Sequence, residues 1–141
     1  MRPAGRMSLM VFFLLLGGAG TGALAQADFY EGKTVRVIVG LAAGGGYDAY
    51  ARTIAGHLGK HIPGNPAIVV ENMTGAGSII AANHLYKIAK PDGLTLGHYL
   101  GGIALQQLLG KSGIEFDARR FRYIGVPAQD NFIIGVHRST G

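Results

Sequence analysis

Short apolar runs alternate with amphipathic stretches along the middle of the chain. The first run, 34–40, is rich in β-branched residues and ends in glycine, which is typical of a buried strand. After Gly44-Gly45-Gly46, apolar residues recur at helical spacing from Ala51 to Ile62 and form one stripe. Prolines and glycine at 63–66 end this helix. The pattern therefore predicts a strand, a glycine-rich loop and a helix in succession.

The same unit then recurs. Residues 67–71 form a second predicted strand, and a second glycine-rich loop, Asn72 to Gly77, follows it. Ser78 is a suitable N-cap for a helix with apolar positions from Ala81 to Ala89. Two strand–loop–helix units in a row indicate an α/β fold.

Further elements continue this alternation. A third strand is predicted at 94–99 after a Pro-Asp-Gly turn, a short helix opens at Gly101-Gly102, and two more strands are predicted at 123–126 and 132–136. Such alternation predicts a mostly parallel sheet with helices on both faces. Open sheets of this kind bind ligands at the carboxyl ends of their strands. We therefore expect the loops 44–48 and 72–78 to lie together at one rim.

The N-terminal residues have the layout of a secretory signal peptide. Arg2 and Arg6 precede an apolar run at 9–16, small residues follow, and A-x-A cleavage sites end at Ala25 and Ala27. The alternative, a transmembrane anchor, needs about 20 apolar residues, which this run does not supply. We expect residues 1–25 to be the signal peptide, with the exact cleavage site left open, and residues 26–141 to be periplasmic.

Charge and composition narrow the function further. The formal net charge is +5, and it falls to +3 without the signal peptide because Arg2 and Arg6 are removed with it. The basic residues are scattered, apart from a cluster at 119–122 that we interpret as a solvated turn. Nucleic-acid binding needs a basic face, so no nucleic-acid partner is expected. The chain contains no cysteine, which excludes disulfides and thiol chemistry.

The two glycine loops are the candidate binding site. Gly44 to Gly46 lack side chains, so their N–H groups can approach a ligand closely, and the following helix N-terminus favours an anion. The run from Gly75 to Ser78 has the same character and adds a hydroxyl. Neither loop contains Lys or Arg, so N–H groups and helix dipoles would neutralise most of an anion's charge. The alternative is a tight strand-to-helix turn without a ligand.

Other patterns in the chain are weaker. Residues 75–81 fit the loose dinucleotide fingerprint G-x-G-x-x-A, but Asp92 lies in a turn where the supporting acidic residue should end a strand. His57 and His61 could share a helix face for a metal, although surface histidines are the favoured interpretation. We therefore expect neither a metal nor a cofactor. Asp48 could bind a ligand or complement the helix N-terminus, and Tyr47 could line a pocket or cover the loop.

At these motifs the chain resembles the substrate-binding receptors of tripartite tricarboxylate transporters, the Bug-type periplasmic proteins. The resemblance is carried by 29–35, 37–48, 51–52, 61–66, 71–78, 89–93 and 116–125. It implies lobe 1 of a two-lobed, type II periplasmic binding protein, with the second lobe absent from an apparently truncated chain. The chain departs from many members in having Ala43 and Thr74 where they have proline.

The resemblance also implies a function and a site. The expected function is capture of a small organic carboxylate, through backbone N–H groups and ordered water, for delivery to membrane permease subunits. The full-length protein is expected to be a monomer and not an enzyme. The alternative is a small periplasmic α/β enzyme acting on a phosphorylated or carboxylated substrate, although the sequence offers no convincing nucleophile–base pair. The ligand-binding residues carried over are Gly44, Gly45, Gly46, Tyr47, Asp48, Thr74, Gly75, Ala76, Gly77 and Ser78.

Overall fold

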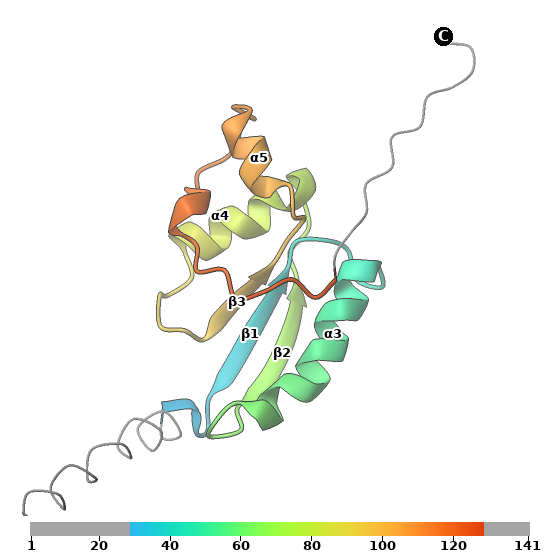
Figure 1. The fold of residues 1–141 in the computed structure, drawn as a ribbon, viewed down its shortest axis with the longest axis vertical. Coiled ribbons are helices and arrows are strands. Elements are labelled where there is room, and N and C mark those ends of the chain that lie inside the picture. Colours follow the sequence, from blue (N-terminus) through green and yellow to red (C-terminus); the bar gives the residue numbers. More distant parts are fainter. Residues whose placement is uncertain (1–28, 129–141) are drawn as a thin grey trace, which may run out of the picture.

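Three parallel strands form the centre of the structure (Figure 1). β1 (Thr34–Val39) lies between β2 (Ala67–Asn72) and β3 (Thr95–His98), in the order β2-β1-β3. Val39, the last residue of β1, is in register with Asn72 of β2 and His98 of β3. All three strands therefore end together at one edge of the sheet. The structure is a computed structural model that describes residues 29–128.

Helices connect the strands in the predicted alternation. α3 (Gly46–Leu58) and the 3-10 turn η1 (Gly59–His61) lie between β1 and β2. The 3-10 turn η2 (Ala76–Ser78) and α4 (Ile79–Lys87) lie between β2 and β3. α5 (Ile103–Leu108) and η3 (Ala118–Arg120) follow β3. The predicted α/β fold with a parallel sheet and flanking helices is confirmed.

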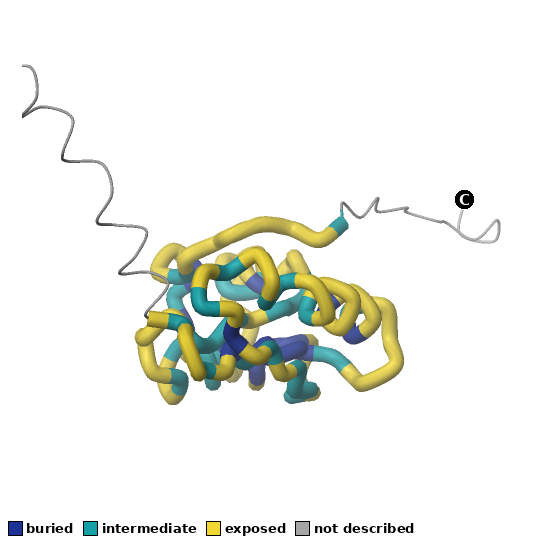
Figure 2. Tube along the Cα trace, turned by 90° about the horizontal axis from the view of Figure 1, so that it is seen from below, coloured by how far each residue is buried: buried dark blue, intermediate teal, exposed yellow. Residues whose placement is uncertain are grey.

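Two apolar clusters cover the sheet. Val37 and Val39 of β1 pack with Ala51 of α3 on one face. Because side chains alternate along a strand, Ile38 projects to the opposite face, where it is also fully buried. The second cluster joins α4, α5 and the segment after α5 through residues such as Ile79 and Phe116. Figure 2 shows the buried positions gathered in the interior of the molecule, with exposed positions around them.

One predicted strand is wrong, and two predictions lie outside the described residues. Tyr123 to Val126 belong to no strand in the structure. Ile124 and Val126 are more than four-fifths exposed, so their β-branched side chains are not buried in a sheet as the pattern suggested. The strand at 132–136 and the signal peptide at 1–25 fall outside residues 29–128. Within the described range, no helix is long and apolar enough to cross a membrane.

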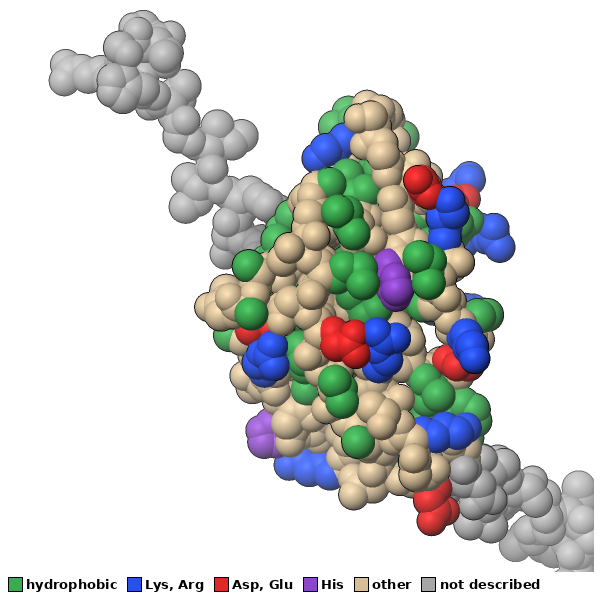
Figure 3. All heavy atoms as spheres, turned by 180° about the vertical axis from the view of Figure 1, so that it is seen from behind, with side chains coloured by type: hydrophobic (Ala, Val, Ile, Leu, Met, Phe, Trp, Pro, Cys, Tyr) green, Lys and Arg blue, Asp and Glu red, His purple; other side chains and the backbone are tan. Residues whose placement is uncertain are grey.

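Charges of both signs are mixed over the surface. On the face shown in Figure 3, acidic and basic side chains are interspersed. Arg119, in the basic cluster predicted from sequence, forms an ion pair with Asp117 at 2.8 Å. The neighbouring Arg120 donates to the hydroxyl of Tyr86 at 2.9 Å. These contacts show that two of the clustered arginines are engaged within the protein.

Candidate functional site

The first glycine loop is organised around the carboxylate of Asp48. Asp48 lies in the first turn of α3 and is 3% exposed. Its Oδ2 accepts hydrogen bonds from Nε of Arg52 at 2.9 Å and from the backbone N–H of Gly44 at 2.8 Å. The hydrogen bond from Arg52, followed by those from Gly44 and Asn72, holds the pKa of the Asp48 carboxyl well below its usual range. The structure thus places this carboxylate inside the loop, where it stays ionised, rather than on the open rim.

Asn72 joins the first loop to the second. Its Nδ2 donates to Oδ1 of Asp48 at 2.9 Å and to the carbonyl of Leu41 at 3.0 Å. Its Oδ1 accepts a hydrogen bond from Arg52 at 3.0 Å. The predicted meeting of the two loops at one rim is therefore confirmed. Sequence reasoning did not assign this joining role to Asn72 or Arg52.

The second loop has a left-handed backbone over four consecutive residues. The φ angles are +134° at Gly75, +47° at Ala76, +63° at Gly77 and +73° at Ser78. A positive φ costs glycine little, but it costs alanine or serine on the order of 1–3 kcal/mol each. Runs of this kind can direct successive N–H groups into one concavity that suits an anion. Such strain persists only where surrounding contacts impose it, and it is frequent at ligand sites.

Ser78 supplies those contacts. Its side chain is fully buried, and Oγ donates to the carbonyl of Gly40 at 3.2 Å and accepts from the N–H of Leu100 at 3.3 Å. One hydroxyl therefore connects the segments that follow β1, β2 and β3. Ser78 is the N-cap residue of α4, as predicted, but its side chain makes no capping hydrogen bond. Its single hydroxyl proton is used within the protein and is not available to a ligand.

The predicted ligand-binding residues other than Asp48 and Ser78 differ in their exposure to solvent. Tyr47 and Gly75 are half-buried, whereas the other six are exposed: Gly44, Gly45, Gly46, Thr74, Ala76 and Gly77. Gly44 has a φ of +81° and needs to be glycine, but Gly45 has a φ of −80° that any residue can adopt. A Cβ on Gly45 would lie 3.4 Å from the carbonyl oxygen of Ala42, which is an ordinary contact. The ligand-binding role of these residues remains a prediction.

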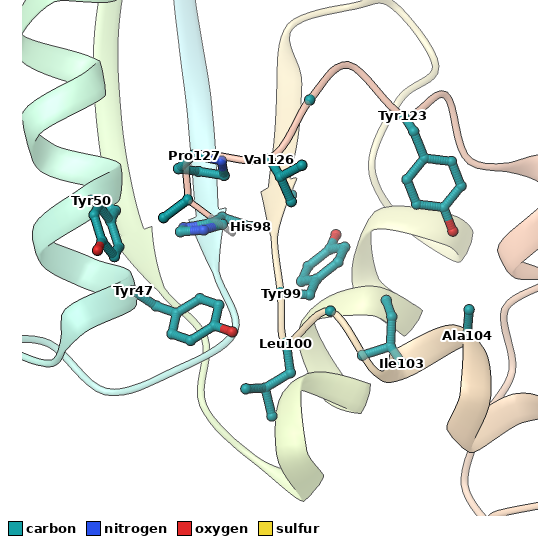
Figure 4. Close-up of a pocket in the computed structure, with 14 residues that line it drawn as sticks. Tyr47, Tyr50, His98, Tyr99, Leu100, Ile103, Ala104, Tyr123, Val126 and Pro127 are labelled. Atoms are coloured by element: carbon teal, nitrogen blue, oxygen red, sulfur yellow. The ribbon is translucent and has the colours of Figure 1, made fainter. Parts of the chain in front are cut away.

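A pocket of about 370 Å³ opens beside the loops, at the carboxyl end of β3 (Figure 4). Tyr47 is the member of the predicted set that lines it, and its ring lies 5.1 Å from that of His98. The connection from β1 runs to β2 on one side, and the connection from β2 then runs past β1 to β3 on the other. Open α/β sheets bind ligands at the carboxyl ends of the strands where the strand order reverses in this way, and the pocket lies there. The lining residues are Tyr47, Tyr50, Gly97, His98, Tyr99, Leu100, Gly101, Ile103, Ala104, Tyr123, Gly125, Val126, Pro127 and Ala128.

Two polar atoms are buried in the walls of this pocket without a hydrogen-bond partner in the described structure. They are Nδ1 of His98 and the hydroxyl oxygen of Tyr99. Burial lowers the pKa of His98, and a backbone hydrogen bond with Tyr47 opposes this effect only in part. Burial also raises the pKa of Tyr99. Both side chains are therefore uncharged at neutral pH. In the sequence, His98 and Tyr99 are the last residues of a predicted strand, and that pattern does not indicate that they line a pocket.

Comparisons with known proteins identify relatives of this segment. No protein-family model matches the chain. Over 81 residues it is 41% identical to "UPF0065 protein in gbd 5'region" of Cupriavidus necator, covering 57% of this chain and 24% of the relative. Over 88 residues it is 36% identical to "Protein BugT" of Bordetella pertussis, covering 62% of this chain and 26% of the relative. The resemblance to the Bug-type proteins is confirmed.

The matched region is a minor part of both relatives. The chain spans about a quarter of the length of the two relatives named above. Among solved structures it is similar to one described as "Structure of a periplasmic transporter", with 40% identity and a TM-score of 0.44. That similarity covers 48% of this chain and 22% of the other.

The structure also brings a cation to the second loop. A Cβ placed on Gly77 would lie 3.9 Å from Nζ of Lys111 and 3.9 Å from Nε2 of Gln106. The Lys111 ammonium donates to Oε1 of Gln106 at 3.0 Å and is exposed. The expectation that backbone groups and helix dipoles neutralise most of an anion's charge stays a prediction, and Lys111 is a cation near the loop that it did not include. Lys111 was missed because it follows α5 and lies far from the loop in sequence.

The histidine pair on α3 and η1 has a different environment. Nδ1 of His57 lies 3.2 Å from Nζ of Lys60, a surface contact between neighbouring turns. A search of residues 29–128 found no group of three or more His, Cys, Asp or Glu side chains arranged to hold a metal ion. His57 and His61 therefore gain no third ligand within this range.

Proposed function

We propose that this chain is part of an extracytoplasmic solute-binding receptor that captures a small organic carboxylate for a tripartite tricarboxylate-type transporter. Its similarity to BugT and the UPF0065 proteins supports the receptor class. The observation that carries the choice of ligand is the left-handed run from Gly75 to Ser78, fixed beside the N-terminus of α3. Both features favour an anion through backbone N–H groups.

The loops are preorganised for this role by contacts that leave their outer surface open. Asp48 and Asn72 join the loops from within, and Ser78 holds the second loop to the ends of β1 and β3. The exposed glycines carry no side chain that would keep a ligand from the backbone. A preorganised site loses less conformational entropy when a solute binds. The solute can therefore be recognised mainly by the backbone of two rigid loops.

Lys111 adds an exposed positive charge at the edge of this site. Its ammonium is exposed, so solvent and salt screen its attraction for an anion. We assign it a supporting role in attracting the carboxylate, with the N–H groups of Gly46 and of Gly75–Gly77 as the principal donors, because the N–H groups of Gly44 and Gly45 already donate to Asp48 and Ala42. In the complete receptor, membrane permease subunits would take the solute onward.

A titration of the ¹⁵N-labelled chain with acetate, followed by NMR, tests this proposal. NMR detects millimolar binding, which suits a chain that represents only part of its relatives' length. Acetate should shift the amide signals of 44–47 and 75–78 to saturation. Acetamide has the same shape without the charge, and it should leave these signals in place. Equal responses to the two compounds, or no response in these loops, would contradict carboxylate recognition.

A further inference from the structure

The aromatic pocket adjoins both glycine loops. Tyr47 directly follows Gly44-Gly45-Gly46 and lines the pocket. Leu100 also lines it, and its Cδ1 lies 3.9 Å from the position that a Cβ on Gly77 would occupy. A solute whose carboxylate lies at the loops therefore has this pocket beside it for the rest of the molecule.

The walls of the pocket offer no charge to a second carboxylate. None of its described lining residues is Asp, Glu, Lys or Arg. His98 is the one titratable base among them, and burial keeps its imidazole neutral at neutral pH. An anion placed against such walls would lose water without gaining a cation, which is strongly unfavourable. The pocket therefore disfavours the additional carboxylates of a dicarboxylate or tricarboxylate.

The same walls are well suited to an aromatic ring. Tyr47, Tyr99 and Val126 all line the pocket, with Tyr47 on the α3 side of β3 and Tyr99 on the side of α5 (Figure 4). Tyr50, His98 and Tyr123 add further ring surface around the pocket. Aromatic rings pack favourably edge-to-face or in offset stacks. The volume of about 370 Å³ lies within the usual range for a small-molecule site and is ample for one six-membered ring.

We infer that the solute is an aromatic monocarboxylate, with its ring in the pocket formed by Tyr47, Tyr99 and Val126 and its carboxylate at the two glycine loops. This inference rests on the proposed function, because the loops must first hold a carboxylate. The inference goes beyond the proposed function because it names the chemistry of the solute's uncharged end and the number of charges that the solute carries.

The direct test compares phenylacetate with acetate, succinate and phenylacetamide, again by NMR titration of the whole chain. Phenylacetate should bind at least about tenfold more tightly than acetate or succinate. It should also shift the signals of His98 and Tyr99 together with those of the loops. If succinate binds as tightly as phenylacetate, the ring-pocket inference is wrong while the proposed function stands. If phenylacetamide equals phenylacetate, carboxylate recognition fails, and the proposed function fails with it.

A pair of substitutions on α5 locates the ring. Ala104 is exposed and lines the pocket, so Ala104→Phe fills it from the surface. Leu108 lies one turn further along the same helix, is 83% exposed and does not line the pocket, so Leu108→Phe is the matched control. Ala104→Phe should weaken phenylacetate binding by about tenfold or more and leave acetate unchanged, whereas Leu108→Phe should change neither.

Unchanged phenylacetate affinity in folded Ala104→Phe protein would overturn the inference. Dispersion of the amide signals shows whether the variant is folded. If it is not, Tyr123→Ala removes one aromatic wall at a position that is 70% exposed. That variant should weaken phenylacetate binding about threefold and leave acetate unchanged. Equal phenylacetate binding by Tyr123→Ala and the unmodified chain would then contradict the placement of the ring.

Discussion

Asn72 donates a hydrogen bond to Oδ1 of Asp48 across 2.9 Å and thereby joins the two glycine loops at the carboxyl edge of the sheet. The same amide group also donates to Leu41 and accepts from Arg52. Asn72 is the last residue of β2, and Asp48 lies in the first turn of α3. Together with the Ser78 hydroxyl, which bonds to Gly40, this side chain at the end of the sheet sets the relative position of the loops.

Asn72→Leu should separate the loops without removing a strand residue. Each hydrogen bond contributes on the order of 1 kcal/mol, so the three lost bonds should lower the free energy of unfolding by about 2–3 kcal/mol. Urea unfolding measures this, and the amide signals of 44–46 should shift. Asn83→Ala is the control, because Asn83 also makes two side-chain hydrogen bonds to a loop, but at 113–115. Unshifted signals at 44–46 in Asn72→Leu would show that another contact joins the loops.

The Asp48 carboxylate should make stability depend on pH. Its pKa is lower in the folded chain than its ordinary value of about 4. A lowered folded-state pKa stabilises the protein above the ordinary value, and this contribution is lost as the pH falls towards the folded-state pKa. The difference in unfolding free energy between the unmodified chain and Asp48→Asn should therefore shrink from pH 7 to pH 3. Urea unfolding at several pH values measures it. A difference that stays constant would mean that the carboxylate charge is not stabilising.

Gly45→Val should abolish acetate binding while leaving the stability of the fold nearly unchanged. The backbone at Gly45 has a φ of −80°, and a Cβ there meets only the Ala42 carbonyl at 3.4 Å. We expect the free energy of unfolding to change by less than about 1 kcal/mol. Acetate-induced shifts should disappear, because the new side chain covers the N–H groups. Gly56→Ala is the control within α3, since its Cβ would meet nothing within 4 Å. If Gly45→Val binds acetate normally, the first loop does not contact the carboxylate.

Lys111→Met should weaken acetate binding about threefold, and the difference should fade at high salt. The physical reason is that the ammonium lies near Gly77 but remains exposed. Lys90→Met changes the net charge equally at another exposed lysine and serves as the control. Equal weakening by both variants in an NMR titration would indicate a general charge effect and no local role for Lys111.

Expression in a Gram-negative bacterium should give a processed chain in the periplasm. The A-x-A sites place the new N-terminus at Gln26 or Asp28. Mass spectrometry of the periplasmic fraction determines it. A chain that keeps Met1 and stays in the cytoplasm would contradict the predicted export.

Local sequence patterns were sufficient to predict most of the fold. The β-branched run of β1 is mostly buried, that of β2 forms the predicted strand although it is only partly buried, and the helical spacing from Ala51 onwards is found in α3. Topology alone then predicted that the loops after these strands meet. The prediction of a strand at 123–126 is wrong because the same residue pattern also occurs in exposed connecting segments. Pairing with a neighbouring strand would distinguish a strand from such a segment, and residues 123–126 pair with none of the described strands.

The details of the site depend on contacts that no local pattern encodes. Ala76 and Ser78 adopt positive φ because Gly40 and Leu100 hold the Ser78 hydroxyl in place. Tyr99 and His98 are ordinary strand residues in sequence, and they become pocket walls only where β3 ends beside α3 and α5. Asp48 lies in the first turn of α3, and besides its near neighbours Gly44 and Arg52 it is bonded by Asn72 of β2. The contacts from Gly40, Leu100 and Asn72 all come from partners distant in the sequence.

The most direct measurement of the central claim is the intermolecular nuclear Overhauser effect between bound acetate and the chain. The methyl protons of acetate should show contacts with the amide protons of Gly46 and Gly77, one from each loop, and these contacts should be absent in Gly45→Val. Contacts confined to surface lysines, or to residues outside 44–48 and 72–78, would contradict a carboxylate site built from the two glycine loops.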